Sequence, residues 1–159
     1  MSDAVERFVN ACSALGFDVQ VRRFPQGTKT AQDAADAIGC DVGQIVKSLI
    51  FTADGDRPLL ALTSGSNRVD EGRLAAIAGA ASVRRATPDE ARAATGFAVG
   101  GTPPFAHPRP VDSFCDPDLL GHDRVWAAAG TPDSVFPINP EILMRLSGAS
   151  VAGFTVDVP

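Results

Sequence analysis

The sequence predicts an α+β fold with a largely antiparallel or mixed sheet, and three observations support it. Predicted strands come in adjacent pairs with helices between the groups, whereas a doubly wound parallel sheet alternates strand and helix strictly. Apolar residues make up 45% and charged residues 21% of the 159 residues, an ordinary balance for a folded chain. This length fits one domain, so we expect residues 1–159 to form a single compact domain.

Helices are predicted where apolar residues recur at helical spacing between a capping residue and a glycine. Ser2 caps the first helix, in which Val5, Phe8 and Cys12 share a face. The clearest start is Thr87-Pro88-Asp89-Glu90, a capping box with proline at the first helical position. Further helices are expected to begin at Thr30, Asp41, Asp70 and Asn139, and glycines 39, 79 and 96 are expected to end three of the helices.

Strands are predicted where apolar and polar residues alternate, or where short apolar runs end at turn residues. Phe17, Val19 and Val21 alternate with polar residues. The apolar run 47–51 is followed by the turn Asp54-Gly55-Asp56, which makes 59–63 its hairpin partner. The remaining strands are expected at 82–86, 111–115, 124–128, 135–138 and 149–158.

The charge balance limits the partners of the protein. Fourteen basic residues stand against 19 acidic ones, giving a net charge of −5 and an isoelectric point near 4.9. This argues against non-specific binding of nucleic acid, but it leaves room for a local basic groove. Only Lys29 and Lys47 are lysines. Candidates for a basic face are Arg22, Arg23, Lys29, Arg68, Arg73, Arg84 and Arg85.

Cysteine and histidine usage predicts neither a disulfide framework nor a metal site. The three cysteines lack CxxC spacing, and the two histidines, His107 and His122, have no ligand partner at a fixed interval. The N-terminus is charged, unlike a signal peptide, and no run approaches the roughly 20 apolar residues of a membrane span. We therefore expect a cytoplasmic protein that does not contact a membrane.

A glycine-rich loop is the first candidate for chemistry. In Gly100-Gly101-Thr102-Pro103-Pro104-Phe105, the two glycines let the backbone approach a ligand closely, and their N–H groups can face an anion or a carbonyl oxygen. The prolines and the phenylalanine stiffen the far side, so the loop can be held ready for a ligand. The alternative is a simple tight bend between a strand and a coil.

Lys47 and the segment 63–70 are the other candidates. Lys47 stands among apolar residues in a chain that otherwise uses arginine, and a compact ammonium suits a phosphate or an ester carbonyl. The alternative is a surface lysine whose stem covers apolar neighbours. The small polar residues of 63–70 either line a pocket or make only the turn and the helix cap.

Four segments together resemble one known family. They read QIVKSLIF, SGSNRVD, TGFAVGGTPPF and VFPINPEIL, and they follow the order and spacing of the YbaK and prolyl-tRNA synthetase-associated editing domain family. The resemblance runs from about Thr30 to Val156. It implies a compact α+β domain with a mixed, barrel-like sheet flanked by helices. It also implies hydrolysis, in trans, of the ester between a wrong amino acid and its tRNA, with no metal or organic cofactor.

The resemblance also implies roles for particular residues. Lys47 corresponds to the family lysine and would hold the phosphate or ester end of the terminal adenosine. The N–H of Gly101 would stabilise the oxyanion of the tetrahedral intermediate, and a bound water would be the nucleophile. The expected substrate-binding residues are Gly100, Thr102, Pro103, Pro104, Phe105, Ser134, Thr30 and Ser66.

The amino acid removed depends on Ser134 in this prediction. Relatives that take alanine off the tRNA for proline often carry a histidine two residues before the phenylalanine that here is Phe136. A serine there tolerates alanine or pairs with a small hydroxylated side chain, so we expect alanine, serine or cysteine on tRNA-Pro. Expected partners are a tRNA acceptor end and a synthetase. Two alternatives remain open: a non-catalytic module that binds aminoacyl-adenosine, and a hydrolase of another small ester or amide.

Overall fold

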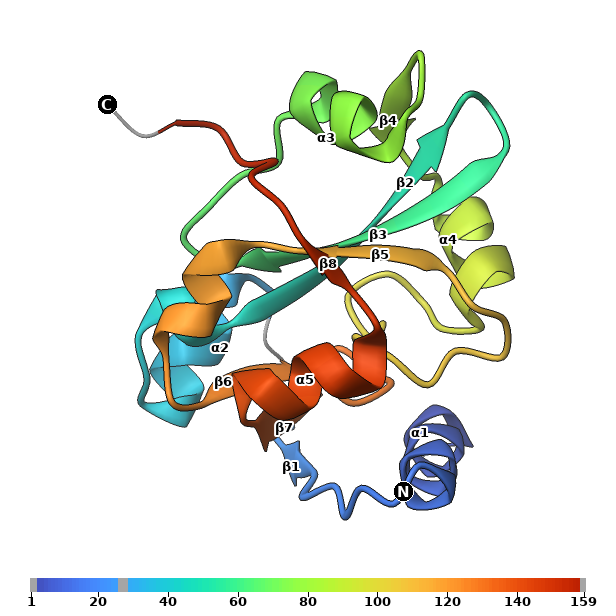
Figure 1. The fold of residues 1–159 in the computed structure, drawn as a ribbon. Coiled ribbons are helices and arrows are strands. Elements are labelled where there is room, and N and C mark those ends of the chain that lie inside the picture. Colours follow the sequence, from blue (N-terminus) through green and yellow to red (C-terminus); the bar gives the residue numbers. More distant parts are fainter. Residues whose placement is uncertain (1–2, 26–28, 158–159) are drawn as a thin grey trace.

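The computed structural model describes residues 3–25 and 29–157 and confirms the α+β prediction (Figure 1). Ser2 and Val158, assigned above to a helix cap and a strand, lie outside the described residues. The helices are α1 Asp3–Ala14, α2 Ala31–Ile38, η1 Val42–Gln44, α3 Glu71–Ala78, α4 Pro88–Thr95, η2 Pro117–Gly121 and α5 Pro140–Ser147. The strands are β1 Arg22–Arg23, β2 Val46–Ala53, β3 Arg57–Ser64, β4 Val83–Arg85, β5 Asp112–Cys115, β6 Val125–Ala128, β7 Ser134–Ile138 and β8 Ser150–Val151.

The predicted helix starts are confirmed by the hydrogen bonds of their caps. The Thr30 hydroxyl accepts from the Asp33 N–H, and Thr87 and Glu90 form the reciprocal capping box. At α5, the Asn139 side chain accepts from the Glu141 N–H. These side chains satisfy backbone donors that an isolated helix end leaves unpaired. The short helix expected after Asp41 is a single 3-10 turn, η1.

The strands form two sheets. The larger has the order β4-β2-β3-β5-β8; β2 is antiparallel to β3 and β4, whereas β5 is parallel to β3 and β8. The smaller has the antiparallel order β1-β7-β6. An isolated parallel bridge between Ile45 and Trp126 connects the two. The predicted mixed sheet is therefore confirmed, but the sheets do not close into a barrel.

Two predicted strands are wrong in extent. Residues 17–21 form no strand; Phe17, Val19 and Val21 pack against the main core, and pairing with β7 begins only at β1. At the C-terminus, pairing is limited to β8 and to a bridge between Val69 and Thr155. Alternation of apolar residues reports which side chains are buried, but a strand also needs a neighbour with free hydrogen-bonding groups.

The larger sheet is buried on both faces. On one face, Ile50, Leu60 and Leu62 belong to the main core with residues of α1, α5 and the smaller sheet. On the other, Phe51, Leu59 and Ala61 pack with Leu74 of α3 and Phe154. In Figure 1, α1 and α5 lie on one side of β2, β3 and β5, and α3 lies on the other. Successive residues of β2 therefore face different layers, which decides where its polar side chains go.

Candidate active-site pocket

A pocket of about 310 Å³ lies beside β2, at the stretch where this strand has a neighbour on only one edge. β3 pairs with β2 along residues 46–53, whereas β4 pairs only with 51–53. On the β4 side, β6 reaches the segment only at the Ile45–Trp126 bridge. The gap between these contacts leaves 46–50 as one wall of the pocket. The start of α2, the 99–102 loop, β6 and the turn before β7 supply the other walls.

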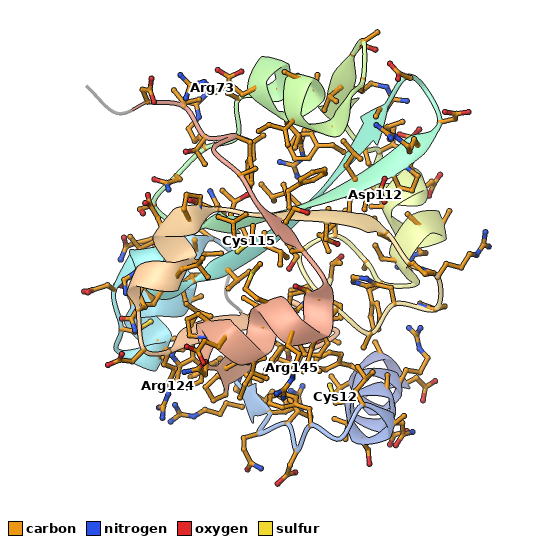
Figure 2. All side chains as sticks on the ribbon, in the orientation of Figure 1. Cys12, Arg73, Asp112, Cys115, Arg124 and Arg145 are labelled. Carbon is orange, nitrogen blue, oxygen red and sulfur yellow. The ribbon has the colours of Figure 1, made fainter. Side chains whose placement is uncertain are left out.

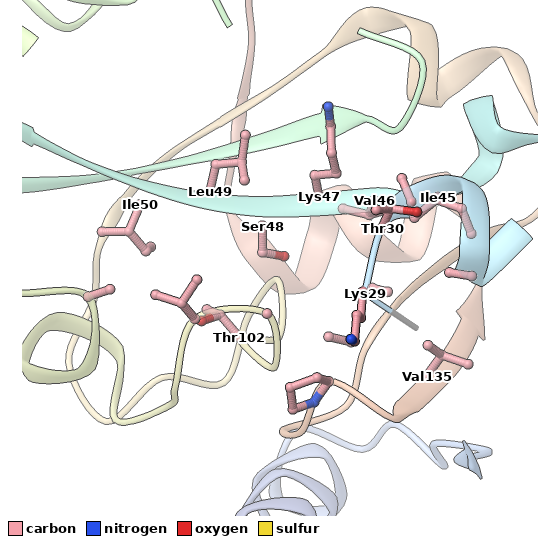
Figure 3. Close-up of a pocket in the computed structure, with 18 of the residues that line it drawn as sticks. Lys29, Thr30, Ile45, Val46, Lys47, Ser48, Leu49, Ile50, Thr102 and Val135 are labelled. Carbon is pink, nitrogen blue, oxygen red and sulfur yellow. The ribbon is translucent and has the colours of Figure 1, made fainter. Parts of the chain in front are cut away.

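Lys47 and Ser48 leave β2 on opposite sides (Figure 3). Ser48 lies on the same face as Val46 and Ile50, and its side chain points toward Thr102 across the pocket. Lys47 lines the pocket as well, but its ammonium is directed to the other face of the strand and donates to the backbone carbonyl of Asn67 at 2.5 Å. In this structure the ammonium therefore does not face the backbone of Gly100 and Gly101.

The surroundings of Lys47 lower the pKa of its ammonium. Burial lowers the pKa of the Lys47 ammonium first, and the positive charges of Arg85 and Arg68 lower it further. The carboxylate of Asp116 acts in the opposite direction and raises that pKa. The hydrogen-bond partner of the ammonium is thus a neutral carbonyl, and among the described residues Lys47 forms no ion pair within 4 Å.

Asp116 organises the turn that receives Lys47. It is 1% exposed, and its carboxylate accepts from the N–H of Ser64 at 3.0 Å and from the Asn67 side-chain amide at 2.8 Å. Its second oxygen accepts from the N–H of Asp118 at 2.9 Å. Of the two readings given for segment 63–70, the structure supports the turn and the helix cap: none of these residues lines the pocket, and the Asp70 side chain caps α3. The buried Asp116 carboxylate holds this turn, which sequence spacing did not reveal.

The glycine loop combines one residue at the pocket with one packed behind it. Gly100 lines the pocket and has a φ of +87°, a conformation that side-chain-bearing residues rarely adopt. At Gly101, a Cβ would lie 2.7 Å from Cα of Thr131, so this residue allows close packing against the neighbouring turn. The Gly101 N–H donates to the carbonyl of Ala98 at 3.0 Å. The donor predicted for the oxyanion is thus engaged within the loop.

The far side of the loop is anchored in the core. Phe105 is 2% exposed and packs against Phe8, Phe17 and Phe136. His107 contacts the carbonyl of Pro103 through Nε2 at 2.8 Å, and burial lowers the pKa of the His107 ring. A neutral imidazole in this position donates to that carbonyl. The loop is therefore fixed by packing on one side while Gly100 and Thr102 line the pocket.

Four of the predicted site residues line the pocket: Lys47, Gly100, Thr102 and Thr30. The others are not among its lining residues. The Ser134 hydroxyl is bonded to the Thr131 hydroxyl at 2.5 Å and is 2% exposed, while Ser66 is paired with Ser64 at 3.1 Å. Four further predicted site residues, which belong to the loop itself, are buried: Gly101, Pro103, Pro104 and Phe105. The roles predicted for these residues stay predictions.

Cations at the pocket were partly missed by sequence reasoning. Lys29, predicted as a member of a basic face but not as a site residue, lines the pocket, so both lysines of the chain contribute to its lining. Arg85 also lines it, and Arg22 lies over the ring of Trp126, another lining residue. By contrast, the predicted basic-face members Arg23, Arg73 and Arg84 form ion pairs with Asp133, Asp157 and Glu90. Figure 2 shows Arg73 beside the C-terminal segment.

Within residues 3–25 and 29–157, no three or more of His, Cys, Asp and Glu gather as a metal site would require. The described helices are also too short or too polar to cross a bilayer. What the site does offer is apolar walls, hydroxyls of Thr30, Ser48 and Thr102, and cationic side chains at one small pocket. A lining of this kind suits a small ligand that carries both an apolar part and an anionic part.

The chain belongs to the aminoacyl-tRNA editing domain family, whose model matches residues 25–146. Its fold is similar to a crystal structure described as "a putative trans-editing enzyme for prolyl tRNA synthetase", with a TM-score of 0.92, 43% identity and 99% of both chains covered. The proline–tRNA ligase of Nitratidesulfovibrio vulgaris is 34% identical over 63% of this chain, which corresponds to only 17% of that ligase. The "Putative Cys-tRNA(Pro)/Cys-tRNA(Cys) deacylase EbsC" of Enterococcus faecalis is 22% identical over 79% of this chain and 77% of the relative.

Proposed function

We propose that this protein is a trans-editing deacylase that hydrolyses the ester of a mischarged aminoacyl-tRNA in the cytoplasm, as one domain spanning residues 1–159. The observation that carries the proposal is the pocket between β2 and the 99–102 loop, within a chain of the editing-domain family. The pocket, of about 310 Å³, accommodates an alanyl, seryl or cysteinyl group, and one of these is the amino acid removed in this proposal. The relatives named above make tRNA-Pro the first tRNA to test.

The chemistry we propose needs no side-chain nucleophile. Water attacks the ester carbonyl, the carbonyl oxygen becomes an oxyanion, and the ribose oxygen leaves with a proton. Because the Gly101 N–H donates to Ala98, we assign the oxyanion to the N–H groups of Gly100 and Thr102, which line the pocket. The substrate's own ribose hydroxyl can position the water.

Lys47 and the other cations hold the tRNA end in this proposal. In this proposal the Lys47 ammonium turns from the Asn67 carbonyl to a phosphate or to the ester end of the terminal adenosine, since an ammonium binds an anionic oxygen more strongly than a neutral carbonyl. Lys29 and Arg85 add two cations at the same pocket. A small number of contacts to tRNA phosphates suits an acidic domain that binds only the acceptor end of the tRNA.

A panel of aminoacyl-tRNAs tests the proposal, with wild type and Lys47→Ala compared on each substrate. We expect turnover of a small amino acid on tRNA-Pro by the wild type and a large loss in the variant. Absence of turnover on every substrate would contradict the deacylase assignment. Equal rates for the two proteins would contradict only the role of Lys47.

The second candidate is a non-catalytic module that binds an aminoacyl-tRNA end and acts with a synthetase. The engagement of the Gly101 N–H with Ala98 favours it, since one expected oxyanion donor is already used. Tight binding of aminoacyl-tRNA without hydrolysis would support this candidate over the deacylase.

A further inference from the structure

The Ser48 hydroxyl is an unusual feature of the pocket wall. Its Oγ is buried, and among the described residues it is the one buried side-chain nitrogen or oxygen that finds no hydrogen-bond partner. Burying a hydroxyl without a partner is unfavourable, because the group loses its hydrogen bonds to water and gains none in return. Ser48 also lines the pocket and points toward Thr102 (Figure 3). Its unused hydrogen-bonding capacity is therefore placed where a ligand enters.

The surroundings of Ser48 limit what that ligand group can be. Val46 and Ile50 share its face of β2, and Ala86 and Ala91 line the same pocket. The described lining residues include Lys29, Lys47 and Arg85 but no carboxylate. A positively charged substrate side chain at Ser48 would meet repulsion and no counter-charge, whereas a neutral hydroxyl side chain meets no repulsion. A thiol is a weaker donor and acceptor than a hydroxyl.

We infer that Ser48 hydrogen-bonds the side-chain hydroxyl of the aminoacyl group, so that the pocket prefers a seryl to an alanyl substrate. This inference rests on the proposed function and names its substrate class. A serine side chain rotates among staggered positions, and its hydroxyl both donates and accepts, so it can pair with an incoming hydroxyl. Thr102 lines the pocket but is assigned no hydrogen bond to the substrate hydroxyl, because its own hydroxyl donates to the Ala98 carbonyl at 3.2 Å.

The specificity comes from the difference between the two substrates. With a seryl group, the Ser48 hydroxyl gains the partner that it lacks within the protein. With an alanyl group, a methyl lies beside it and the hydroxyl stays unpaired in an apolar surrounding. A site that pairs a substrate hydroxyl discriminates against the analogue lacking it more strongly than an apolar pocket discriminates by size.

The test uses seryl and alanyl amides of 3′-amino-3′-deoxyadenosine, which cannot be hydrolysed, titrated by calorimetry into wild type, Ser48→Ala and Ser113→Ala. The control Ser113 hydroxyl donates to the Val111 carbonyl, and Ser113 is not a lining residue. We expect the wild type and Ser113→Ala to bind the seryl amide about tenfold more tightly than the alanyl amide. Ser48→Ala should bind the two amides equally, through weaker binding of the seryl amide alone.

Three results would overturn the inference: equal binding of both amides by the wild type, a seryl preference that survives in Ser48→Ala, or an equal loss for both amides. The last would place Ser48 on a group common to both ligands. Thermal melting gives an independent readout, since removing an unpartnered hydroxyl should leave the melting temperature unchanged or higher. A lower melting temperature would show that the hydroxyl has a partner within the protein.

Deacylation assays separate this inference from the proposed function. If the seryl amide is preferred but no aminoacyl-tRNA is hydrolysed, the deacylase proposal fails and the Ser48 assignment holds. If seryl-tRNA and alanyl-tRNA are hydrolysed at equal rates, with equal binding of the two amides, the Ser48 assignment fails and the deacylase proposal holds.

Discussion

Lys47 and Ser48 are neighbours in β2, yet the ammonium of one donates to the Asn67 carbonyl while the hydroxyl of the other points toward Thr102. The alternation of side chains along a strand enforces this separation. The pair therefore places two different groups at one point of the chain: a cation beside the pocket and a neutral hydroxyl in its wall.

Replacing Lys47 by arginine should lower kcat/KM for the best aminoacyl-tRNA by at least about tenfold, although the charge is kept. The flat guanidinium is larger than the ammonium and is a poor substitute for a point charge at a half-buried position. Steady-state deacylation measures the effect, and melting curves confirm folding. A fully active Lys47→Arg variant would show that any cation serves at this position.

Asp116→Asn should destabilise the protein by at least about 2 kcal/mol, because a buried carboxylate that accepts three hydrogen bonds is replaced by an amide. Because the charge of Asp116 raises the pKa of Lys47, its loss should lower that pKa further. An activity that needs the protonated ammonium should then disappear at a lower pH.

Urea unfolding and the pH profile of kcat/KM, corrected for spontaneous ester hydrolysis, measure the two effects of Asp116→Asn. Asp118→Asn is the matched control, since Asp118 accepts from the same Asn67 amide at 2.7 Å but is exposed. It should cost less than about 1 kcal/mol. Equal losses for the two variants would show that burial of Asp116 is unimportant.

Gly101→Ala should destabilise the fold by about 1–3 kcal/mol, because the added Cβ would meet Cα of Thr131 at 2.7 Å and the Gly130 carbonyl oxygen at 2.8 Å. Both are backbone atoms that cannot turn aside. Chemical denaturation measures the change. Gly153→Ala is the control, since its Cβ would meet nothing within 4 Å; similar values for the two variants would contradict the close packing of the loop on the turn.

Arg85→Ala should weaken the binding of tRNA and reduce the slope of log affinity against log salt by about 1, as the loss of one phosphate contact does. Arg73→Ala should leave both unchanged, because Arg73 pairs with Asp157 at 2.7 Å and is not a lining residue. Filter binding over a range of salt concentrations measures the tRNA affinity and the slope for each variant. An unchanged slope for Arg85→Ala would show that Arg85 does not contact a tRNA phosphate.

Glu90 should make stability depend on pH. Its hydrogen bonds with Arg84, followed by the one from the Thr87 backbone N–H, lower the pKa of Glu90 from an ordinary 4.5 to about 2. A carboxylate whose pKa is lowered in the folded state stabilises it above the unfolded-state pKa, and this contribution is lost as the pH falls toward 2. The wild type should therefore melt higher than Glu90→Gln at pH 7, with the difference shrinking below pH 4.5.

Asp89→Asn, which removes a carboxylate from the same helical turn, is the control for Glu90→Gln. Its difference from the wild type should change less over the same pH range, since the interaction with Arg84 is kept. A constant gap between wild type and Glu90→Gln from pH 7 to pH 3 would contradict the lowered pKa.

Interactions between residues close together in the sequence determined the α+β class, the helix starts and the β2–β3 hairpin. Thr30, Thr87 and Asn139 cap their helices with bonds to residues two or three positions away, so sequence alone reveals them. The apolar run and turn of the hairpin are likewise continuous in the chain. Residues 17–21 failed as a strand because strand pairing depends on a neighbour from elsewhere.

Only the tertiary structure decided the composition of the pocket. It exists because β4 and β6 meet β2 at different points and leave the stretch between these contacts without a strand neighbour on one edge. Contacts between distant segments then placed Lys29 and Arg85 at the pocket, Ser134 outside its lining, and the unpartnered Ser48 hydroxyl in its wall. Sequence identified the segments that build the site, and long-range packing selected which side chain of each segment faces the ligand.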